Sequence, residues 1–129
     1  HYLQAFYNSS GTLSGSITTP NGSSTTVAFN VSSDYRLKEN VDYTWDATTR
    51  IKQLKPARFS WISDDTNTLV DGFIAHEVSD IVPEAVAGEK DAVDEEGNPA
   101  YQGIDQAKLV PLLVKTIQEL EARITALES

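Results

Sequence analysis

The sequence contains no cysteine, so disulfide bonds, thiolate chemistry and cysteine-based metal sites are excluded. No apolar run approaches the roughly eighteen residues that a membrane-spanning helix needs, and we expect no membrane partner. Basic residues are few, because 10 Lys and Arg stand against 19 Asp and Glu and give a net charge of −9. This balance argues against nucleic-acid partners, which require a basic surface. Only two histidines are present, one of them at position 1, so we expect neither a metal site nor a cofactor.

Charged side chains are missing altogether from residues 1–32, and every Asp, Glu, Lys and Arg follows this segment. The segment is rich in Ser, Thr, Gly and Asn, and its apolar residues alternate loosely around turns such as Asn21-Gly22. This pattern predicts short strands, with residues 25–31 as the clearest one. Uncharged strands suit an intertwined fibre, in which neighbouring chains cover the strand edges. We therefore predict two parts, a β-rich fibre end at 1–32 and a second domain at 33–129.

The second part predicts an α+β fold, with a small sheet, short helices and a long C-terminal helix. Short helices are expected at 33–40 with Ser33 or Asp34 as the cap, at 48–54 with Asp46 or Thr48 as the cap, and at 77–82 with Pro83 as the stop. Extended segments are expected at 58–62, at 69–75 with an interruption at Asp71-Gly72, at 84–87, and at 100–104.

The longest regular stretch runs from residue 105 to the end and contains a heptad repeat. Apolar residues occupy the a and d positions of three heptads: Val110, Leu113, Ile117, Leu120, Ile124 and Leu127. This spacing predicts a coiled coil over about 106–129, and the alternative is an amphipathic helix that packs on its own domain. Pro111 lacks an N–H, so the coil either begins near Val110 with Pro111 in its first turn or is kinked there.

Two observations bear on the number of helices in this coil. Isoleucine at a with leucine at d favours a dimer. Residues 123–128, however, resemble the short Arg-h-x-x-h-Glu pattern of trimeric coiled coils. Together with the fibre-like composition of residues 1–32, this pattern favours a homotrimer.

Ser33 and Lys38 are the first candidates for chemistry. A Ser–Lys pair can hydrolyse an amide if the lysine is neutral and close enough to accept the serine proton. Five residues of a helix rotate the second side chain about 140° away from the first, and in a strand the two lie on opposite faces. The pair can therefore meet only through a bend or between two chains. The alternative is that Ser33 caps a helix and Lys38 is a solvated surface residue.

His76 is the second candidate, because histidine is the usual general base at neutral pH and this one follows the apolar segment 72–75. The alternative is that it only packs or caps a helix N-terminus. The acidic residues around Gly97 lack the register and the closing Glu of a calcium loop, and we interpret them as a solvated turn.

At this point three segments, in order, resemble one family. Residues 33–40, Ser-Asp-Tyr-Arg-Leu-Lys-Glu-Asn, are similar to the opening signature Ser-Asp-x-Arg-Leu-Lys-x-Asn of the C-terminal intramolecular chaperone domain, or peptidase S74 domain, of bacteriophage tail fibres, tailspikes and endosialidases. Residues 72–78 with 82–86 resemble its second signature, and residues 94–105 with the heptads resemble its third segment. The likeness covers residues 33–129.

The resemblance implies an intramolecular chaperone that trimerises, folds the preceding fibre segment as its client, and then cuts itself off. The cut would fall between Ser32 and Ser33, with Ser33 as the nucleophile, Lys38 as the base and His76 as a supporting residue. Residues 1–32 would stay in the virion tail fibre, while residues 33–129 would act in the infected host cytoplasm and leave after the single turnover. The main alternative is a trimerisation module of a fibre or adhesin that never cuts.

Overall fold

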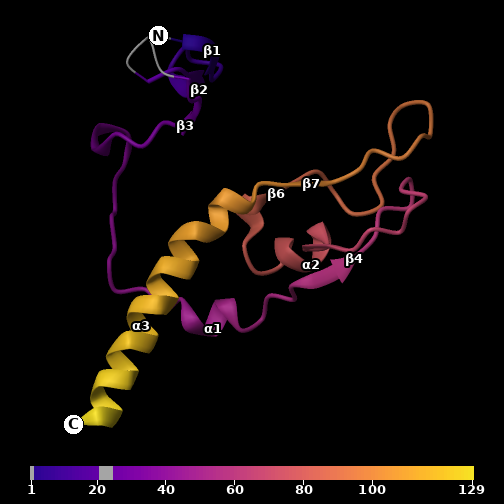
Figure 1. Ribbon diagram of the computed structural model, residues 1–129. Coiled ribbons are helices and arrows are strands. Elements are labelled where there is room, and N and C mark those ends of the chain that lie inside the picture. Colours follow the sequence, from indigo (N-terminus) through magenta and orange to yellow (C-terminus); the bar gives the residue numbers. More distant parts are fainter. Residues whose placement is uncertain (1, 21–24) are drawn as a thin grey trace. The chain divides into compact units, whose positions relative to one another are not determined.

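The computed structural model describes residues 2–20 and 25–129, and the predicted Asn21-Gly22 turn lies outside the described residues. The fold is α+β, as predicted, with small antiparallel sheets and a long C-terminal helix. The chain forms two compact units, residues 1–43 and 44–129 (Figure 1). The sequence predicts a different division, into residues 1–32 and 33–129, which is set by the expected cleavage after Ser32. That division stays a prediction. The signature segment 33–40 belongs to the first compact unit.

The first unit is a three-stranded antiparallel sheet followed by one turn of 3₁₀ helix. The strands are β1 (Tyr2–Tyr7), β2 (Leu13–Thr18) and β3 (Ala28–Val31), in the order β1-β2-β3, and the 3₁₀ helix is η1 (Tyr35–Leu37). Strand β3 pairs with β2 from the contact of Thr18 with Ala28 to the contact of Gly15 with Val31. These short strands confirm the strand-and-turn interpretation of the uncharged segment.

The described part of this unit has no hydrophobic core of its own. The only buried residue among its described positions is Ser16, whereas large apolar side chains such as Phe6, Phe29 and Val31 are exposed. A three-stranded sheet needs a packed hydrophobic face to be stable in water. On the fibre interpretation, neighbouring chains would cover these exposed side chains.

The second unit contains two β-hairpins and the helices around them. Its elements are α1 (Thr48–Ile51), β4 (Ala57–Phe59), β5 (Val70–Gly72), α2 (Ala75–Ser79), η2 (Pro83–Ala85), β6 (Val86–Ala87), β7 (Gly103–Ile104), η3 (Gln106–Leu109) and α3 (Val110–Glu128). Strand β4 pairs with β5, and β6 pairs with β7, both antiparallel. The core of the unit is formed by Ala47, Val78, Val82, Ala85, Leu109 and Leu112. No helix of residues 2–20 and 25–129 is long and apolar enough to cross a membrane.

Two local predictions in this unit are wrong. Asp71-Gly72 does not interrupt the strand, because Asp71 pairs with Arg58 across β4 and β5 and their side chains form an ion pair of 2.8 Å. Pro83 does not end a helix but begins one. Helix α2 already ends at Ser79, and Pro83 takes the first position of η2, where its missing N–H costs nothing. Part of the segment predicted as extended is therefore 3₁₀-helical.

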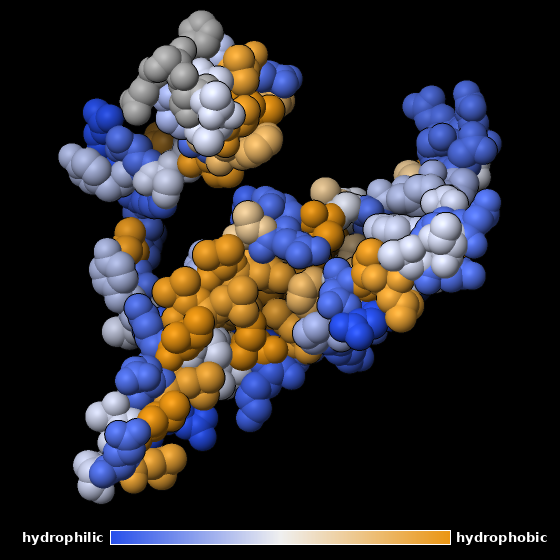
Figure 2. Space-filling view, in the orientation of Figure 1, coloured by the Kyte–Doolittle hydropathy of each residue, from blue (hydrophilic) through white to orange (hydrophobic). Residues whose placement is uncertain are grey.

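Helix α3 has one buried face and one exposed apolar face. Leu112 and Thr116 are buried against the second unit, and Figure 1 shows α1 alongside the middle of α3. The other face contains the predicted a and d residues, which we call the heptad face: Val110, Leu113, Ile117, Leu120, Ile124 and Leu127. These six residues are between 42% and 86% exposed. Figure 2 shows the corresponding apolar surface along α3. Pro111 lies in the first turn of α3, directly after η3, where its missing N–H leaves no intrahelical bond unmade.

Polar contacts fix α3 to the rest of its unit. Both carboxylate oxygens of Glu119 accept the N–H of Ala47, and Oε1 also accepts the N–H and the hydroxyl of Thr48 at 2.8 and 2.7 Å. Glu119 therefore satisfies the free N–H groups at the start of α1, where a negative charge is favoured. The predicted cap Asp46 contributes as well, because its carboxylate accepts the N–H of Thr49 at 3.4 Å and the hydroxyl of Thr49 at 2.5 Å. The N-cap position itself is Ala47, which makes no side-chain cap bond.

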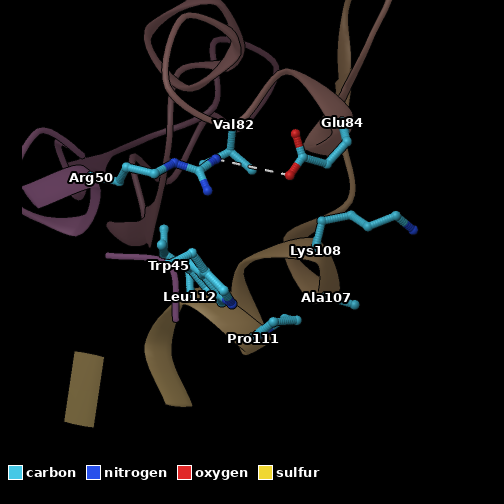
Figure 3. A pocket seen from close by; sticks show the side chains of 8 residues that line it. All are labelled: Trp45, Arg50, Val82, Glu84, Ala107, Lys108, Pro111 and Leu112. Carbon is cyan, nitrogen blue, oxygen red and sulfur yellow. Dashed lines mark ion pairs between the residues drawn. The ribbon is translucent and has the colours of Figure 1, made fainter. Parts of the chain in front are cut away.

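At the beginning of α3 a cavity of about 300 Å³ opens between the helix and the core (Figure 3). Trp45, Pro111 and Leu112 form its apolar side. Arg50 spans it, donating to the carbonyl of Ile81 at 2.9 Å and lying 3.9 Å from the Glu84 carboxylate. The arginine is thus engaged in holding the unit together, and we assign the cavity a structural role.

Candidate active site

The signature segment 33–40 folds into one tight turn. Asp34 is the N-cap of η1, and its Oδ1 accepts the N–H of Arg36 at 2.9 Å. The N–H of Leu37 bonds to the carbonyl of Asp34, and the N–H of Lys38 bonds to the carbonyl of Tyr35, both at 3.1 Å. The prediction of a short helix with Asp34 as its cap is confirmed. The backbone is extended at Asp34 and again at Lys38, so the single helical turn lies between two extended residues.

This turn brings Ser33 and Lys38 together within one chain. The Nζ of Lys38 donates a hydrogen bond of 2.6 Å to the Oγ of Ser33. Spacing rules for a regular helix or strand place the two side chains on different faces, and neither rule applies to a turn flanked by extended residues. The bend that the sequence required for this contact is therefore η1.

Asp34 and Arg36, the two charged residues between Ser33 and Lys38, form an ion pair. The guanidinium of Arg36 donates from Nε to Oδ1 of Asp34 at 2.9 Å and from Nη2 to Oδ2 at 3.0 Å. The side-chain bond from Arg36, together with its backbone N–H, lowers the pKa of Asp34, and Asp34 raises the pKa of Arg36. Asp34 is thus ionised and paired with Arg36. An unpaired carboxylate would favour the protonated form of the nearby Lys38, and the pairing with Arg36 weakens this effect.

The residue before the nucleophile candidate is held by the sheet. The N–H of Ser32 bonds to the carbonyl of Ser14 at 2.9 Å, and the Oγ of Ser32 donates to the carbonyl of Leu13. Both acceptors belong to β2, so these bonds extend the β2–β3 pairing by one residue beyond Val31. Sequence reasoning missed the role of this hydroxyl, because one serine in a Ser-rich segment carries no distinguishing signal.

Ser33 and Lys38 are both exposed in the described chain. The 2.6 Å hydrogen bond joins Lys38 Nζ to Ser33 Oγ. A lysine acts as a base only when it is neutral, and desolvation or a neighbouring cation is needed to make it so. The single chain already brings Ser33 and Lys38 into contact. The described residues of the first unit do not shield this contact from water.

His76 lies on α2 in the second unit, whereas Ser33 and Lys38 belong to the first unit. It is half-buried and lines two adjoining cavities of about 420 and 360 Å³ between α2 and residues 88–102. Its carbonyl accepts the hydroxyl of Ser79 at 3.0 Å. The acidic turn near Gly97 is closed by Asp94, whose Oδ1 accepts two backbone N–H groups.

Comparison with known families places a match on the part of the chain that contains this turn. Residues 33–87 match the family model of peptidase S74, described as chaperone of endosialidase. The match begins at Ser33, the first residue after the uncharged segment, and ends at Ala87, before the acidic turn and the heptads. No match to a curated protein was found. The family's names describe a peptidase and a chaperone. Residues 33–87 thus match the peptidase S74 family, chaperone of endosialidase, which is the family that the ordered motifs indicate.

Proposed function

We propose that residues 33–129 are an intramolecular chaperone that trimerises, assists the folding of the fibre end at 1–32, and then releases itself by cutting the Ser32–Ser33 bond. The observation that carries this proposal is the 2.6 Å hydrogen bond between Lys38 Nζ and Ser33 Oγ. It lies at the first residues of the segment matched by a peptidase and chaperone family. The enzyme class is a self-cleaving serine endopeptidase that works once.

The reaction begins when neutral Lys38 accepts the hydroxyl proton of Ser33. Ser33 Oγ then bonds to the carbonyl carbon of Ser32, the C–N bond to Ser33 breaks, and the Ser33 nitrogen takes up the proton from Lys38. The product is an ester between the Ser32 acyl group and Ser33 Oγ. Water hydrolyses this ester, which leaves a carboxylate on Ser32 and a free amine and hydroxyl on Ser33. Holding the reacting groups in place is worth about 7–11 kcal/mol of barrier in well-aligned cases.

Trimerisation is supported by the heptad face. Its six side chains are exposed in the single chain although they repeat with coiled-coil spacing, and residues 121–129 are exposed throughout. Figure 1 shows the C-terminal turns of α3 extending past α1. Burying such a face against two further copies of the chain removes apolar surface from water, which is the usual driving force of assembly. The first unit, with its exposed Phe29 and Val31, has the same need of neighbours.

Assembly also supplies a reason for the timing of the cut. Because Ser33 and Lys38 are exposed in one chain, Lys38 stays solvated until neighbouring chains cover the turn. Cleavage then follows correct assembly, removes the chaperone and makes the process hard to reverse. We place residues 1–32 in the virion tail fibre, and we place the action and release of residues 33–129 in the infected host cytoplasm. The proposed reaction uses no cofactor.

Two substitutions at the pair test the cleavage proposal. Ser33→Ala removes the nucleophile, and Lys38→Arg keeps a positive charge in place but puts there a group that stays protonated. Both variants are expected to yield only uncut chain near 14.1 kDa on a denaturing gel and by intact mass, whereas the parent yields two fragments. Ser9→Ala, which changes an exposed serine of the same unit, serves as the control and is expected to cut normally. Cleavage by Ser33→Ala would refute the assignment of the nucleophile.

His76 is proposed as a supporting residue, because it occupies a position of the second signature. His76→Ala is expected to slow cleavage without abolishing it. The competing proposal is a trimerisation module that does not cut, favoured by the exposure of the pair in the single chain. A parent protein that forms trimers but remains one species of 14.1 kDa would support that alternative.

A further inference from the structure

Ser32 stands at the junction between the sheet and the signature turn. On one side, its N–H and its hydroxyl bond to the carbonyls of Ser14 and Leu13 on β2. On the other side, Ser33 Oγ is held by Lys38 Nζ at 2.6 Å. The peptide bond between Ser32 and Ser33 therefore joins two groups that are each fixed by a hydrogen bond to a different structural element.

This arrangement matters for the proposed reaction, in which Ser33 Oγ attacks the carbonyl carbon of Ser32. The rate of such an attack depends steeply on how often the two atoms adopt the reactive geometry. The signature turn fixes the oxygen, and the sheet fixes the residue that carries the carbonyl. If β3 separates from β2, both bonds of Ser32 are lost together, while the Ser33–Lys38 contact is formed entirely by residues 33–38.

We propose that the Ser32 hydroxyl is a positioning group that couples cleavage to the docking of β3 on β2. Its hydrogen bond to Leu13 holds the acyl side of the bond to be cut, so that the chaperone cuts itself off only from a fibre end whose last strand has paired. This inference rests on the proposed self-cleavage and names a structural condition for it. Ser32 acts through the position of its own carbonyl, and Ser33 and Lys38 do the chemistry.

Other contacts show that the β2–β3 pairing is a suitable sensor. The side-chain amide of Asn30 donates to the hydroxyls of Ser16 and Thr18 at 3.3 and 3.1 Å, which fixes the register of β3. Gly15 lies opposite Val31, and a Cβ at Gly15 would approach the carbonyl oxygen of Asn30 to 2.8 Å. Because backbone atoms cannot yield as a flexible side chain can, any residue larger than glycine at position 15 forces β2 and β3 apart.

The test uses the full 129-residue chain, pulse-labelled during expression and chased, with cleavage followed on denaturing gels. Ser32→Ala removes one neutral hydrogen bond, which is worth roughly 0.5–1.5 kcal/mol, and is expected to slow cleavage about fivefold. Ser32→Thr keeps the hydroxyl and is expected to restore most of the rate. Gly15→Ala loosens both bonds of Ser32 and is expected to slow cleavage more than Ser32→Ala. Gly103→Ala, where an added Cβ meets nothing within 4 Å, is the matched control and is expected to cut at the parental rate.

The outcomes separate this inference from the proposed function. If the parent is cut and Ser33→Ala is not, but Ser32→Ala or Gly15→Ala is cut at the parental rate, the coupling is refuted and self-cleavage stands. Ser32→Thr that is as slow as Ser32→Ala would also refute it, because a role of the hydroxyl requires rescue. If the parent itself is not cut, or Ser33→Ala is still cut, the proposed function fails first.

Discussion

Replacing Ile117 with alanine tests whether the heptad face of α3 is the trimer interface. Ile117 occupies an a position and is 65% exposed in the single chain. In a trimeric coiled coil the same side chain lies at the centre of the interface, so its truncation removes contacts that exist only in the assembly. We therefore expect the fold of each chain to survive and the trimer to weaken.

The magnitude follows from the exposed fraction. Burying a whole isoleucine side chain is worth about 1.5–3 kcal/mol, and 65% of it remains to be buried, which corresponds to about 1–2 kcal/mol per chain. Three copies meet in a trimer, so Ile117→Ala is expected to cost about 3–6 kcal/mol of trimer stability before any cavity forms. At about 1.4 kcal/mol per factor of ten, the trimer dissociation constant rises roughly 10²- to 10⁴-fold.

The assay is sedimentation equilibrium over a range of protein concentrations, carried out in the Ser33→Ala background so that all chains stay intact. Gln118→Ala is the matched control, because Gln118 is the exposed neighbour at position b, outside the a and d positions. The expected result is a trimer for the control and a shift toward monomer for Ile117→Ala at the same concentrations. A monomeric parent, or an Ile117→Ala variant that associates as tightly as the control, would refute the assignment of this face.

Two further predictions concern the second unit. Leu112 is 3% exposed and belongs to the core. The variant Leu112→Ala is expected to lose about 2–5 kcal/mol of unfolding free energy, measured by denaturant unfolding. A loss below about 0.5 kcal/mol would contradict the place of Leu112 in the core. The hydroxyl and N–H of Thr48, with the N–H of Ala47, lower the pKa of Glu119. The stability that Glu119 adds to the fold is therefore fully present above the pKa of an unfolded Glu, about 4.3, and is lost as the pH falls through the lower pKa of the folded state. Thermal melts between pH 6 and about 3 should therefore show a smaller loss of stability for Glu119→Gln than for the parent, and equal losses would contradict this role.

The sequence predicted the elements whose determinants are local. The heptads and Pro111 located α3 and its first turn, and Asp34 located the cap of η1, because helix periodicity and capping depend on residues a few positions apart. The α+β class followed from the same local patterns. Strands were predicted too long, as at residues 25–31, where β3 comprises only Ala28–Val31. Pairing decides strand ends, and pairing partners are distant in sequence.

The candidate site shows the same division. Ser33 and Lys38 were chosen as a Ser–Lys pair, and the resemblance to a family gave them their roles. Their contact could not be derived from spacing, since the rules for regular elements do not describe one 3₁₀ turn between extended residues. The bonds of Ser32 to β2 and of Glu119 to the start of α1 join residues that are far apart in sequence. Contacts of this kind depend on the fold and leave no signal in residue type or local pattern.

The most direct test of self-cleavage is the N-terminal sequence and intact mass of the protein produced from the full 129-residue chain. We predict two fragments, the smaller ending at Ser32 and the larger beginning with Ser-Asp-Tyr-Arg at Ser33, and only uncut chain near 14.1 kDa from Lys38→Arg. A parent that remains a single species of 14.1 kDa in assembled trimers, or a new N-terminus at any residue other than Ser33, would contradict the account.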